Sequence, residues 1–267
     1  MHLIDTHTHL YVKQFDDDRL ATIQRAMTAG IQQFYLPAID SETHDAMLAL
    51  EADYPQHCFA MMGLHPCSVK ANYEKELKIV EDWLGKRHFC AIGEIGLDLH
   101  WDTTFFEEQK DAFKRQIAWA KKLDIPIVIH SRKSTWEVVD ILRAEKDEKL
   151  RGIFHCFGGT VEEAEAIIDC GFYLGIGGVL TFKKAGLDKT MEHIDLEHVV
   201  LETDAPYLAP SPYRGKRNES AYIKIIAERL ASIKQMDLAE ISRITSENAK
   251  KIFVNSSNEA LLFRKAR

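Results

Sequence analysis

Side chains of the types that bind metal ions follow several short apolar runs of this sequence. Ile4-Asp-Thr-His-Thr-His9 places His7 and His9 two residues apart, so on a strand both imidazoles face the same side and can reach one ion. In a chain with 12 histidines such a pair arises easily by chance, and hydrogen-bonded surface histidines explain it as well. The pair becomes informative in combination with the residues that end the other apolar runs.

Four further apolar runs end on a residue of the same kind. They are Ile92-Gly-Glu94, Ile127-Val-Ile-His130, Gly152-Ile-Phe-His155 and Leu201-Glu-Thr-Asp204. Taken singly, each is explained by a core histidine or a helix-capping carboxylate. Taken together they indicate bound metal, because charged groups are rarely found at the ends of buried apolar strands without a partner.

The number of these ligands predicts two divalent metal ions. The first is expected to have His7, His9 and Asp204 as ligands and the second His130 and His155, with Glu94 bridging them. Mixed histidine and carboxylate ligands suit Zn2+, Mn2+ or similar ions. Mg2+ prefers oxygen ligands and water and would bind less tightly, and the identity of the metal stays open between these ions. The expected chemistry is hydrolysis by a metal-activated water, with Asp204 accepting its proton and the second ion stabilising the leaving oxygen.

Basic residues near the same strand ends are candidates for binding the substrate. Arg132 follows His130 by two positions, where a guanidinium can hold a phosphate or carboxylate with two hydrogen bonds. The loop after the last strand gathers Arg214, Lys216 and Arg217, and barrels often bind phosphate near their last strands. The alternative for these three residues is a solvated loop.

Four other residues near the predicted site each have alternative roles. Glu202 is predicted to orient a metal ligand from one layer deeper, or to form a buried structural pair. His65 is predicted to donate a proton or contact a phosphate, or to be a hydrogen-bonded wall residue. Asp98 is predicted to cap the loop after the fourth strand, and Trp101 in that loop to stack on a base or to have a lid or core role.

Short apolar runs alternate with longer segments of helical periodicity along the chain. The apolar runs begin near residues 3, 33, 58, 89, 125, 152, 172 and 198. Apolar residues recur from Phe106 to Leu123 as one stripe of an amphipathic helix. Ser134-x-x-Glu137 and Thr160-x-x-Glu163 predict capping boxes that open two further helices. The alternation predicts an α/β fold of the (β/α)8 TIM-barrel class, in which all carboxyl strand ends lie on one face.

Two more helical stretches are predicted after residue 220. They would complete the outer ring and cover one end of the barrel. We predict a single metal-dependent hydrolase domain over residues 1–267, with a loosely held tail from about residue 255.

The composition argues against several classes of protein. A net charge of −7 excludes a broad basic surface for nucleic acid, so contact with an anionic substrate must be local. Five cysteines without a C-x-x-C pair favour free thiols over disulfides. No apolar run is long enough for a membrane helix, and no signal peptide is recognisable. We therefore expect a soluble cytoplasmic protein without an obligate protein partner.

The sequence resembles the TatD-like metal-dependent nucleases, which belong to the wider group of amidohydrolase-type barrels. The resemblance runs from Asp5 to about Phe253 and rests on the ordered motifs Asp5-Thr-His-Thr-His9, Gly63-Leu-His-Pro66, Gly93-Glu-Ile-Gly-Leu-Asp98, His130-Ser-Arg132, His155-Cys-Phe157, Leu201-Glu-Thr-Asp-Ala-Pro206, Arg214-Gly-Lys-Arg-Asn218 and Ser246-Glu-Asn248. It implies a (β/α)8 fold, divalent metal ions and hydrolysis of phosphodiesters, seen in characterised relatives as deoxyribonuclease activity, often 3′ to 5′ on single strands. By similarity, the metal ligands are His7, His9, Glu94, His130, His155 and Asp204.

Two positions depart from the pattern of these nucleases. Many relatives have an acidic residue where this chain has Lys133, and paired tyrosines where it has Leu99-His100. Both positions lie near the expected substrate, so the metal chemistry is expected to be kept while the natural substrate stays open.

The predicted function is a metal-dependent phosphodiester hydrolase, a nuclease that acts on the ends of single-stranded DNA or other single-stranded nucleic acid. One alternative is an amide, lactone or other ester hydrolase on the same barrel. Many such barrels use a modified lysine as the bridging ligand, so Glu94 in that place argues against this alternative. The other alternative, from a different class, is a non-catalytic metal-binding barrel.

Overall fold

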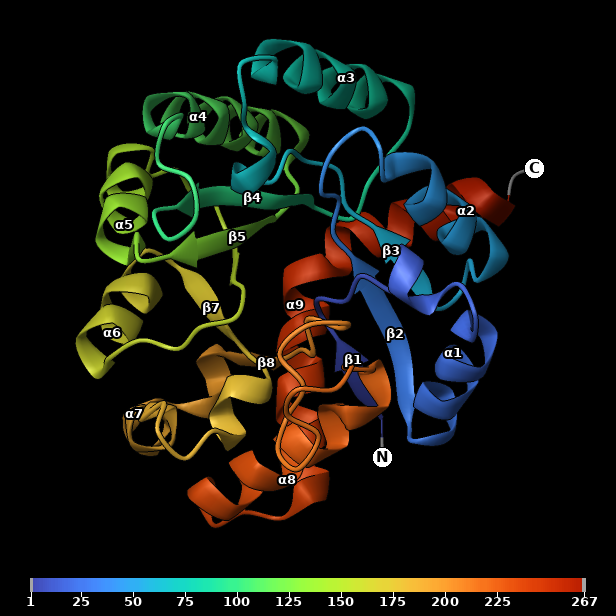
Figure 1. Cartoon of the computed structure of the whole chain (residues 1–267), viewed down its shortest axis with the longest axis vertical. Helices are drawn as coiled ribbons and strands as arrows, with labels where there is room; N and C mark the ends of the chain where they lie inside the picture. The colour runs from blue at the N-terminus through green and yellow to red at the C-terminus, as the bar shows by residue number, and fades with distance from the viewer. Residues whose placement is uncertain (1, 266–267) are drawn as a thin grey trace.

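Eight parallel strands form the centre of the protein in the computed structural model, which describes residues 2–265 and the side chains of residues 2–253 (Figure 1). The strands are β1 (Leu3–Asp5), β2 (Ile31–Leu36), β3 (Cys58–Ala60), β4 (Ile92–Asp98), β5 (Ile127–Arg132), β6 (Gly152–Phe154), β7 (Phe172–Ile176) and β8 (Val199–Leu201). All eight predicted strands are therefore present, within a few residues of their expected starts.

Two ladders of strands close into one barrel. Strands β1 to β3 form one parallel ladder and β4 to β8 the other, each in sequence order. A parallel bridge between Met62 and Ile92 joins the ladders on one side, and a bridge between Thr8 and Ala205 joins them on the other. The backbone N–H of Thr6 also donates to the carbonyl of Leu201 at 3.1 Å. The predicted (β/α)8 class is confirmed.

Helices surround the strands, as Figure 1 shows. They are α1 (Arg19–Thr28), α2 (His44–Asp53), α3 (Tyr73–Lys86), α4 (Phe106–Leu123), α5 (Thr135–Ala144), α6 (Val161–Asp169), α7 (Leu187–His193), α8 (Ile223–Lys234) and α9 (Leu238–Lys265). Short 3-10 helices lie at Lys13–Phe15, Pro66–Ser68, Gly178–Thr181, Leu196–His198 and Ser220–Tyr222. The helix expected from the apolar stripe between Phe106 and Leu123 has the predicted bounds.

One of the two predicted capping boxes is formed. Glu163 donates its backbone N–H to the Thr160 hydroxyl, and the Thr160 N–H donates to the Glu163 carboxylate. The box predicted at Ser134 is wrong, although α5 begins there. The Ser134 hydroxyl is buried and donates instead to the carbonyl of Leu97 in β4 at 2.9 Å, so it ties α5 to the barrel.

The barrel interior is apolar at the end where the strands begin. Inward-facing Val128, Ile153 and Val200 belong to one buried cluster with Phe253 of α9. The Phe253 ring stacks on Tyr35 at a centroid distance of 3.9 Å. Helix α9 therefore closes this end, as expected for the C-terminal helices.

The opposite end of the barrel interior is polar. His130, His155 and Glu202 each lie two residues beyond an apolar residue of that cluster, and therefore on the same inward face. The fourth and fifth strands are longer than the sequence predicts, because the β4–β5 ladder continues beyond Glu94 and pairs Asp98 with Arg132. Glu94 thus lies within β4 and not at its end.

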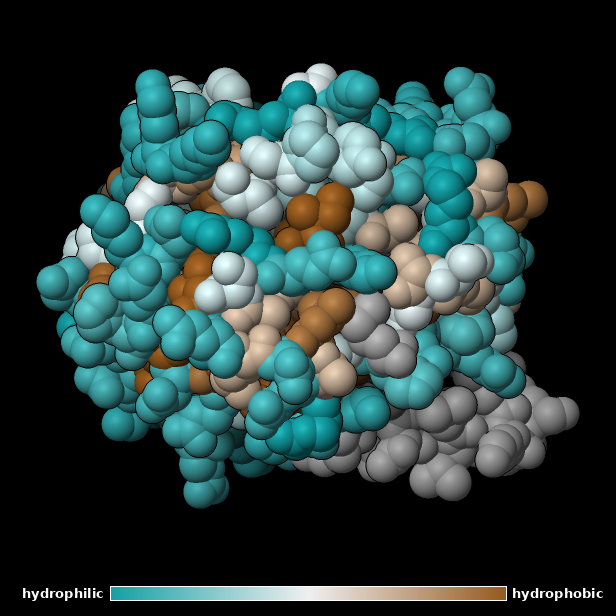
Figure 2. Space-filling view, turned by 90° about the horizontal axis from the view of Figure 1, so that it is seen from below, coloured by the Kyte–Doolittle hydropathy of each residue, from teal (hydrophilic) through white to brown (hydrophobic). Residues whose placement is uncertain are grey.

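The helices and the surface of the described residues bear on the class of protein. None of the helices described combines the length and apolar character that crossing a bilayer requires. On the face drawn in Figure 2, hydrophilic residues cover most of the surface and hydrophobic ones form small patches. The predicted loose tail from about residue 255 concerns side chains outside the described ones, so it stays a prediction, as does the single domain.

Candidate metal centre

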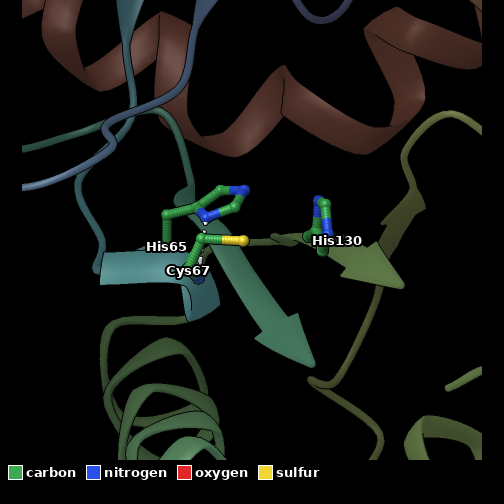
Figure 3. A group of neighbouring side chains, drawn as sticks. All are labelled: His65, Cys67 and His130. Carbon is green, nitrogen blue, oxygen red and sulfur yellow. Dashed lines mark hydrogen bonds between the residues drawn. The ribbon is translucent and has the colours of Figure 1, made fainter. Parts of the chain in front are cut away.

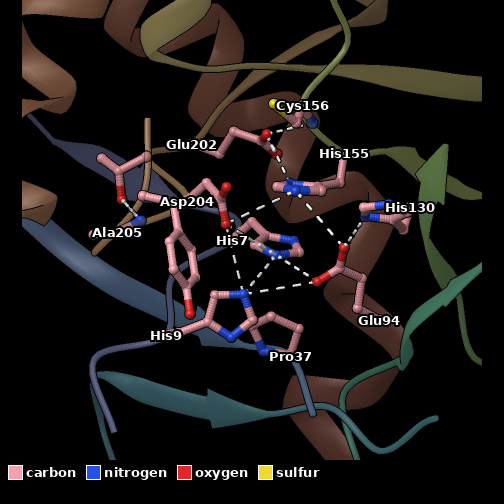
Figure 4. A network of polar contacts seen from close by, with 12 residues as sticks. His7, His9, Pro37, Glu94, His130, His155, Cys156, Glu202, Asp204 and Ala205 are labelled. Carbon is pink, nitrogen blue, oxygen red and sulfur yellow. Dashed lines mark hydrogen bonds and ion pairs between the residues drawn. The ribbon is translucent and has the colours of Figure 1, made fainter. Parts of the chain in front are cut away.

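The six predicted ligands meet at the carboxyl ends of the strands (Figure 4). His7 and His9 follow β1, Glu94 lies in β4, His130 in β5, and His155 and Asp204 follow β6 and β8. Contacts of 2.8 to 3.9 Å link their nitrogen and oxygen atoms into one network. Residues far apart in the sequence therefore share one site, as the barrel topology requires.

Four atoms form the first half of this network. Nε2 of His7 lies 3.3 Å from Nε2 of His9, 3.2 Å from Oε2 of Glu94 and 3.8 Å from Oδ1 of Asp204. Nε2 of His9 lies 3.7 and 3.6 Å from the same two oxygens. Tetrahedral ligands about 2.1 Å from one ion are roughly 3.4 Å apart. The spacing of these four atoms therefore fits a single ion.

Glu94 presents its two oxygens to different histidines. Oε2 faces His7 and His9, whereas Oε1 lies 2.8 Å from Nδ1 of His130 and 3.8 Å from Nε2 of His155. Such a division of the two oxygens is the arrangement that bridging two ions requires.

A hydroxyl behind the network fixes the ring of His9. Tyr11 donates its hydroxyl hydrogen to the carbonyl of Pro37 at 2.5 Å, so it accepts a hydrogen bond from Nδ1 of His9 at 2.9 Å. The proton of a neutral His9 is therefore on Nδ1. Its Nε2 lone pair faces Glu94 and Asp204, the orientation of a metal ligand.

Two buried carboxylates contact the outer nitrogens of His130 and His155. Oδ2 of Asp98 lies 2.8 Å from Nε2 of His130, and Oε1 of Glu202 lies 2.9 Å from Nδ1 of His155. A neutral His130 that donates to Asp98 turns its Nδ1 lone pair toward a Glu94 oxygen only 2.8 Å away. Two lone pairs at this distance repel unless a proton or a cation lies between them. The residues present therefore fit bound cations.

Burial and neighbouring charges shift the pKa values of these groups. Burial opposes a charged Glu94, but His65, His7 and His155 outweigh it and hold the pKa of Glu94 well below its usual range. Burial and the charge of His155 lower the pKa of His7 to about 4. Burial also opposes a charged His155, but Glu202 and Glu94 raise its pKa to about 10. The buried carboxylates thus demand positive charge, which protons or divalent ions can supply.

Two glycines make room for this arrangement. A Cβ on Gly96, whose φ is +138°, would overlap the carbonyl oxygen of His130 in the neighbouring strand. A Cβ on Gly175 in β7 would overlap Oε2 of Glu202. Glycine at these positions therefore allows β4 to approach β5 and allows Glu202 to lie beneath the network.

A cavity of about 920 Å³ opens above the network. Its rim carries three basic side chains, Arg132, Arg214 and Lys216, and none of them forms a salt bridge with a described carboxylate. The guanidinium of Arg132 lies 5.2 Å from the ring centroid of Trp101, and that of Arg214 lies 4.1 Å from the ring centroid of Phe182. Cations without a carboxylate partner remain available to an anionic ligand.

His65 lies in the cavity wall beside His130, with Cys67 next to it (Figure 3). Its Nδ1 accepts from the backbone N–H of Cys67 at 3.0 Å, so the proton of the neutral ring is on Nε2. That nitrogen lies 3.3 Å from Oε1 of Glu94. His65 therefore brings a hydrogen-bond donor to the edge of the network.

Comparison with known proteins identifies the family. A family model described as TatD related DNase matches residues 4–254. The metal-dependent hydrolase YabD of Bacillus subtilis (strain 168) is 39% identical to this chain over 94% of its length and 98% of YabD. This chain belongs to the TatD family of metal-dependent hydrolases.

Other TatD-family proteins resemble the chain over nearly its whole length. The 3′-5′ ssDNA/RNA exonuclease TatD of Pectobacterium parmentieri (strain WPP163) is 31% identical over 94% of this chain and 99% of its own. The crystal structure of the TatD homologue YjjV from Escherichia coli K12 has a TM-score of 0.88 and 29% identity, with 94% of this chain and 97% of that chain covered.

Arg217 does not line the cavity of this TatD-family barrel, so its predicted substrate contact is corrected. Its guanidinium pairs with Asp18 at 2.6 and 2.8 Å and donates to the carbonyl of Gln14 at 2.8 Å. Gly215, with a φ of +82°, turns the chain, so that Lys216 lines the cavity while Arg217 is directed to the start of α1.

Asp98 makes two kinds of contact, and only one of them was predicted from the sequence. The predicted loop capping is present, because Oδ1 accepts from the N–H groups of His100 and Trp101 at 2.8 and 2.9 Å. The contact of Oδ2 with His130 was not predicted. A signal was available, since Asp98 lies four residues beyond Glu94 and therefore on the same strand face. Tyr11, two residues beyond His9, was missed as well.

Proposed function

We propose that this protein is a two-metal phosphodiester hydrolase that removes nucleotides from the ends of single-stranded DNA. The observation that carries the proposal is the placement of Glu94, whose oxygens face separate histidines beneath a cavity rimmed by cations without carboxylate partners among the described side chains. A relative named as a 3′-5′ ssDNA/RNA exonuclease supports a polymeric nucleic acid as substrate.

In this proposal the network divides into two ligand sets that share Glu94. His7, His9 and Asp204 would hold one ion, and His130 and His155 would hold the other. Bound divalent ions would activate a water and stabilise charge on the leaving oxygen. The mixture of imidazole and carboxylate donors favours Zn2+, Mn2+ or a similar ion.

The protein's own groups would hold and move the protons. Asp204 lines the cavity with 13% of its side chain exposed, so it can accept a proton from an attacking water. His65 presents its Nε2 hydrogen at the other side of the floor, where it can donate to a phosphate or leaving oxygen. Asp98 and Glu202 would keep the rings of His130 and His155 oriented.

The rim would position the phosphates. Arg132 at the end of β5 and Arg214 and Lys216 after β8 lie on the cavity wall in a protein whose net charge is −7. Their positive charge is thus local, and it favours an anion at the cavity mouth over the broad basic surface of a duplex-binding protein.

The first experiment combines elemental analysis with an activity assay. The purified protein is analysed for metal and then tested, with each metal added back, on end-labelled single-stranded DNA, RNA and blunt duplex DNA. Amide and lactone panels are included. We expect about two equivalents of a transition metal and chelator-sensitive release of nucleotides from single-stranded DNA.

Two results would contradict the proposal. Preferred turnover of lactones or amides would assign the barrel to another class of hydrolase. A protein that binds no metal and is insensitive to chelators would be a non-catalytic barrel.

A further inference from the structure

The cavity rim carries exposed apolar rings as well as cations. Among the residues with described side chains, six large hydrophobic residues are clearly exposed, and Trp101, Tyr207 and Leu208 of these six line this one cavity. Trp101 is the most exposed of the three, at 68%. A large ring in solvent is unfavourable unless a ligand covers it, so the concentration of such residues here indicates a ligand with an apolar face.

The loop that carries Trp101 is held on both sides. The Trp101 N–H donates to Asp98 at 2.9 Å, and the next residue, Asp102, forms a salt bridge with Lys70 at 2.7 Å. Asp102 also accepts from the N–H of Thr104 at 3.0 Å. Exposure of the ring is therefore not a result of a loosely attached loop, and a platform held in this way loses little entropy when it binds a ligand.

The position of Trp101 relates it directly to the proposed phosphate contacts. The guanidinium of Arg132 lies 5.2 Å from its ring centroid, within cation–π range. The same Asp98 carboxylate that accepts from the Trp101 N–H contacts His130 at 2.8 Å. One carboxylate thus connects the ring to the metal-ligand network, and a group stacked on Trp101 lies beside the place where a phosphate would bind.

We propose that Trp101 is a substrate-positioning residue that stacks on the nucleobase of the terminal nucleotide. This inference rests on the proposed function and narrows it to substrates that bear a base next to the cleaved bond. A flat ring, a neighbouring guanidinium and a phosphate-binding floor together match the base and the phosphate of a nucleotide. Stacking of this kind is tolerant of sequence, because every base has a π-face.

Paired substrates and a matched pair of variants test the inference. Trp101→Ala is compared with Trp136→Ala, which removes another exposed tryptophan, 47% exposed on α5 and not part of the cavity lining. Each is assayed on a single-stranded oligonucleotide and on the same oligonucleotide with an abasic terminal nucleotide. We expect Trp101→Ala to raise KM for the base-bearing substrate about tenfold, which corresponds to about 1.4 kcal/mol.

The remaining results are equally specific. KM for the abasic substrate should be the same in Trp101→Ala and the wild type, Trp101→Phe should restore most of the loss, and Trp136→Ala should change neither KM. Equal effects of Trp101→Ala on both substrates, or no effect on either, would overturn the inference.

A binding measurement separates this inference from the proposed function. Tryptophan fluorescence is titrated with deoxyadenosine monophosphate and with deoxyribose phosphate, which has no base. Quenching by the nucleotide alone, lost in Trp101→Phe and kept in Trp136→Phe, would support stacking even in a preparation that cleaves no oligonucleotide. Hydrolysis of oligonucleotides without such quenching would keep the proposed function and reject the role of Trp101.

Discussion

The metal-ligand network forms the floor of the cavity, and it differs from the rim in how its polar groups are paired. On the floor, each ligand atom lies close to another charged or polar group, and the outer nitrogens of His9, His130 and His155 are bound by acceptors. On the rim, Arg132 has no carboxylate partner within residues 2–253, and Trp101 is largely in solvent. The floor thus holds many of its own polar partners but still requires a proton or a cation between Glu94 and His130. The rim obtains partners for its cations and its exposed ring only from a ligand.

The two regions also differ in the elements that carry them. The metal ligands of the floor lie on strands or within four residues of a strand end, where the backbone ladder fixes them, whereas Arg214 and Lys216 on the rim lie in the long loop that follows β8. The metal ligands are thus placed on or beside the strands, whereas the rim combines Arg132, the last residue of β5, with side chains of the loops. Substitutions on the floor should mainly lower kcat, and those on the rim should mainly raise KM.

The largest effect is expected from Glu94→Ala. Loss of the shared carboxylate removes a contact of both ligand sets, so we expect metal content to fall and turnover to drop by at least about a hundredfold. Elemental analysis and kcat at saturating metal check this, with Glu107→Ala on the exposed face of α4 as the control. A Glu94→Ala protein that keeps more than about a tenth of the metal-dependent rate would remove the basis of the two-metal scheme.

The support beneath the floor should give the next largest effect. Glu202→Gln keeps the size of the side chain but weakens the hold on His155, and roughly 10- to 100-fold loss of metal affinity or activity is expected. Gly175→Ala should act in the same direction by pushing Glu202 aside. Gly158→Ala, where an added Cβ lies 3.7 Å from Val179, is the matched control. Wild-type metal affinity in both Glu202→Gln and Gly175→Ala would show that Glu202 has a packing role only.

Asp98 contacts both His130 on the floor and the Trp101 backbone on the rim, so its substitution should change kcat and KM together. Asp98→Asn replaces a charged acceptor by a neutral one, so it binds the loop N–H groups more weakly and holds His130 less well, and we expect roughly tenfold lower kcat. Because the Trp101 loop depends on the same side chain, KM should rise as well. A change in only one of the two parameters, measured by steady-state kinetics with protein of native circular dichroism, would mean that the floor and rim are independent.

The smallest effects are expected from Arg132, which lines the cavity rim, and from Arg217, which does not. Arg132→Ala should raise KM for a phosphodiester about tenfold and change kcat little, because it removes a hydrogen bond to a charged group. Arg217→Ala should leave KM unchanged and lower stability by about 1 kcal/mol or less, since the pair with Asp18 is partly exposed. A larger KM effect for Arg217→Ala than for Arg132→Ala would reverse the assignment.

The stability effect of Arg217→Ala should depend on pH. The hydrogen bond from Arg217 holds the pKa of Asp18 well below its usual value. The pair therefore stabilises the fold above the ordinary pKa of an aspartate, and the contribution is lost as pH falls through the lowered value. The difference in urea midpoint between wild type and Arg217→Ala should shrink below about pH 4. A difference that stays constant down to acid pH would argue against the ion pair.

The barrel and the ligand network follow from local patterns. Apolar runs that end on a ligand-type residue predicted the positions of His130 and His155, because side chains alternate along a strand and parallel strand ends meet at one face. Glu94 was found for the same reason, although β4 continues beyond it. Such patterns depend only on near neighbours in the sequence.

The partners of Arg217 and Ser134 could not be predicted, because they lie in segments that are distant in the sequence. Nothing near Arg217 in the sequence shows that Asp18, 199 residues earlier in the chain, lies within reach. Ser134 has the correct spacing for a capping box, but the Leu97 carbonyl lies closer in space and accepts its hydroxyl hydrogen. The sequence pattern therefore predicts which face a residue occupies more reliably than which partner it binds.

Helix α9 closes the barrel at the end opposite the cavity. Because Phe253 and its buried neighbours fill that end, a strand cannot leave the cavity along the barrel axis. Substrate and product therefore both pass through the open face at the carboxyl ends of the strands. Release of the product through this face therefore competes with binding of the next substrate.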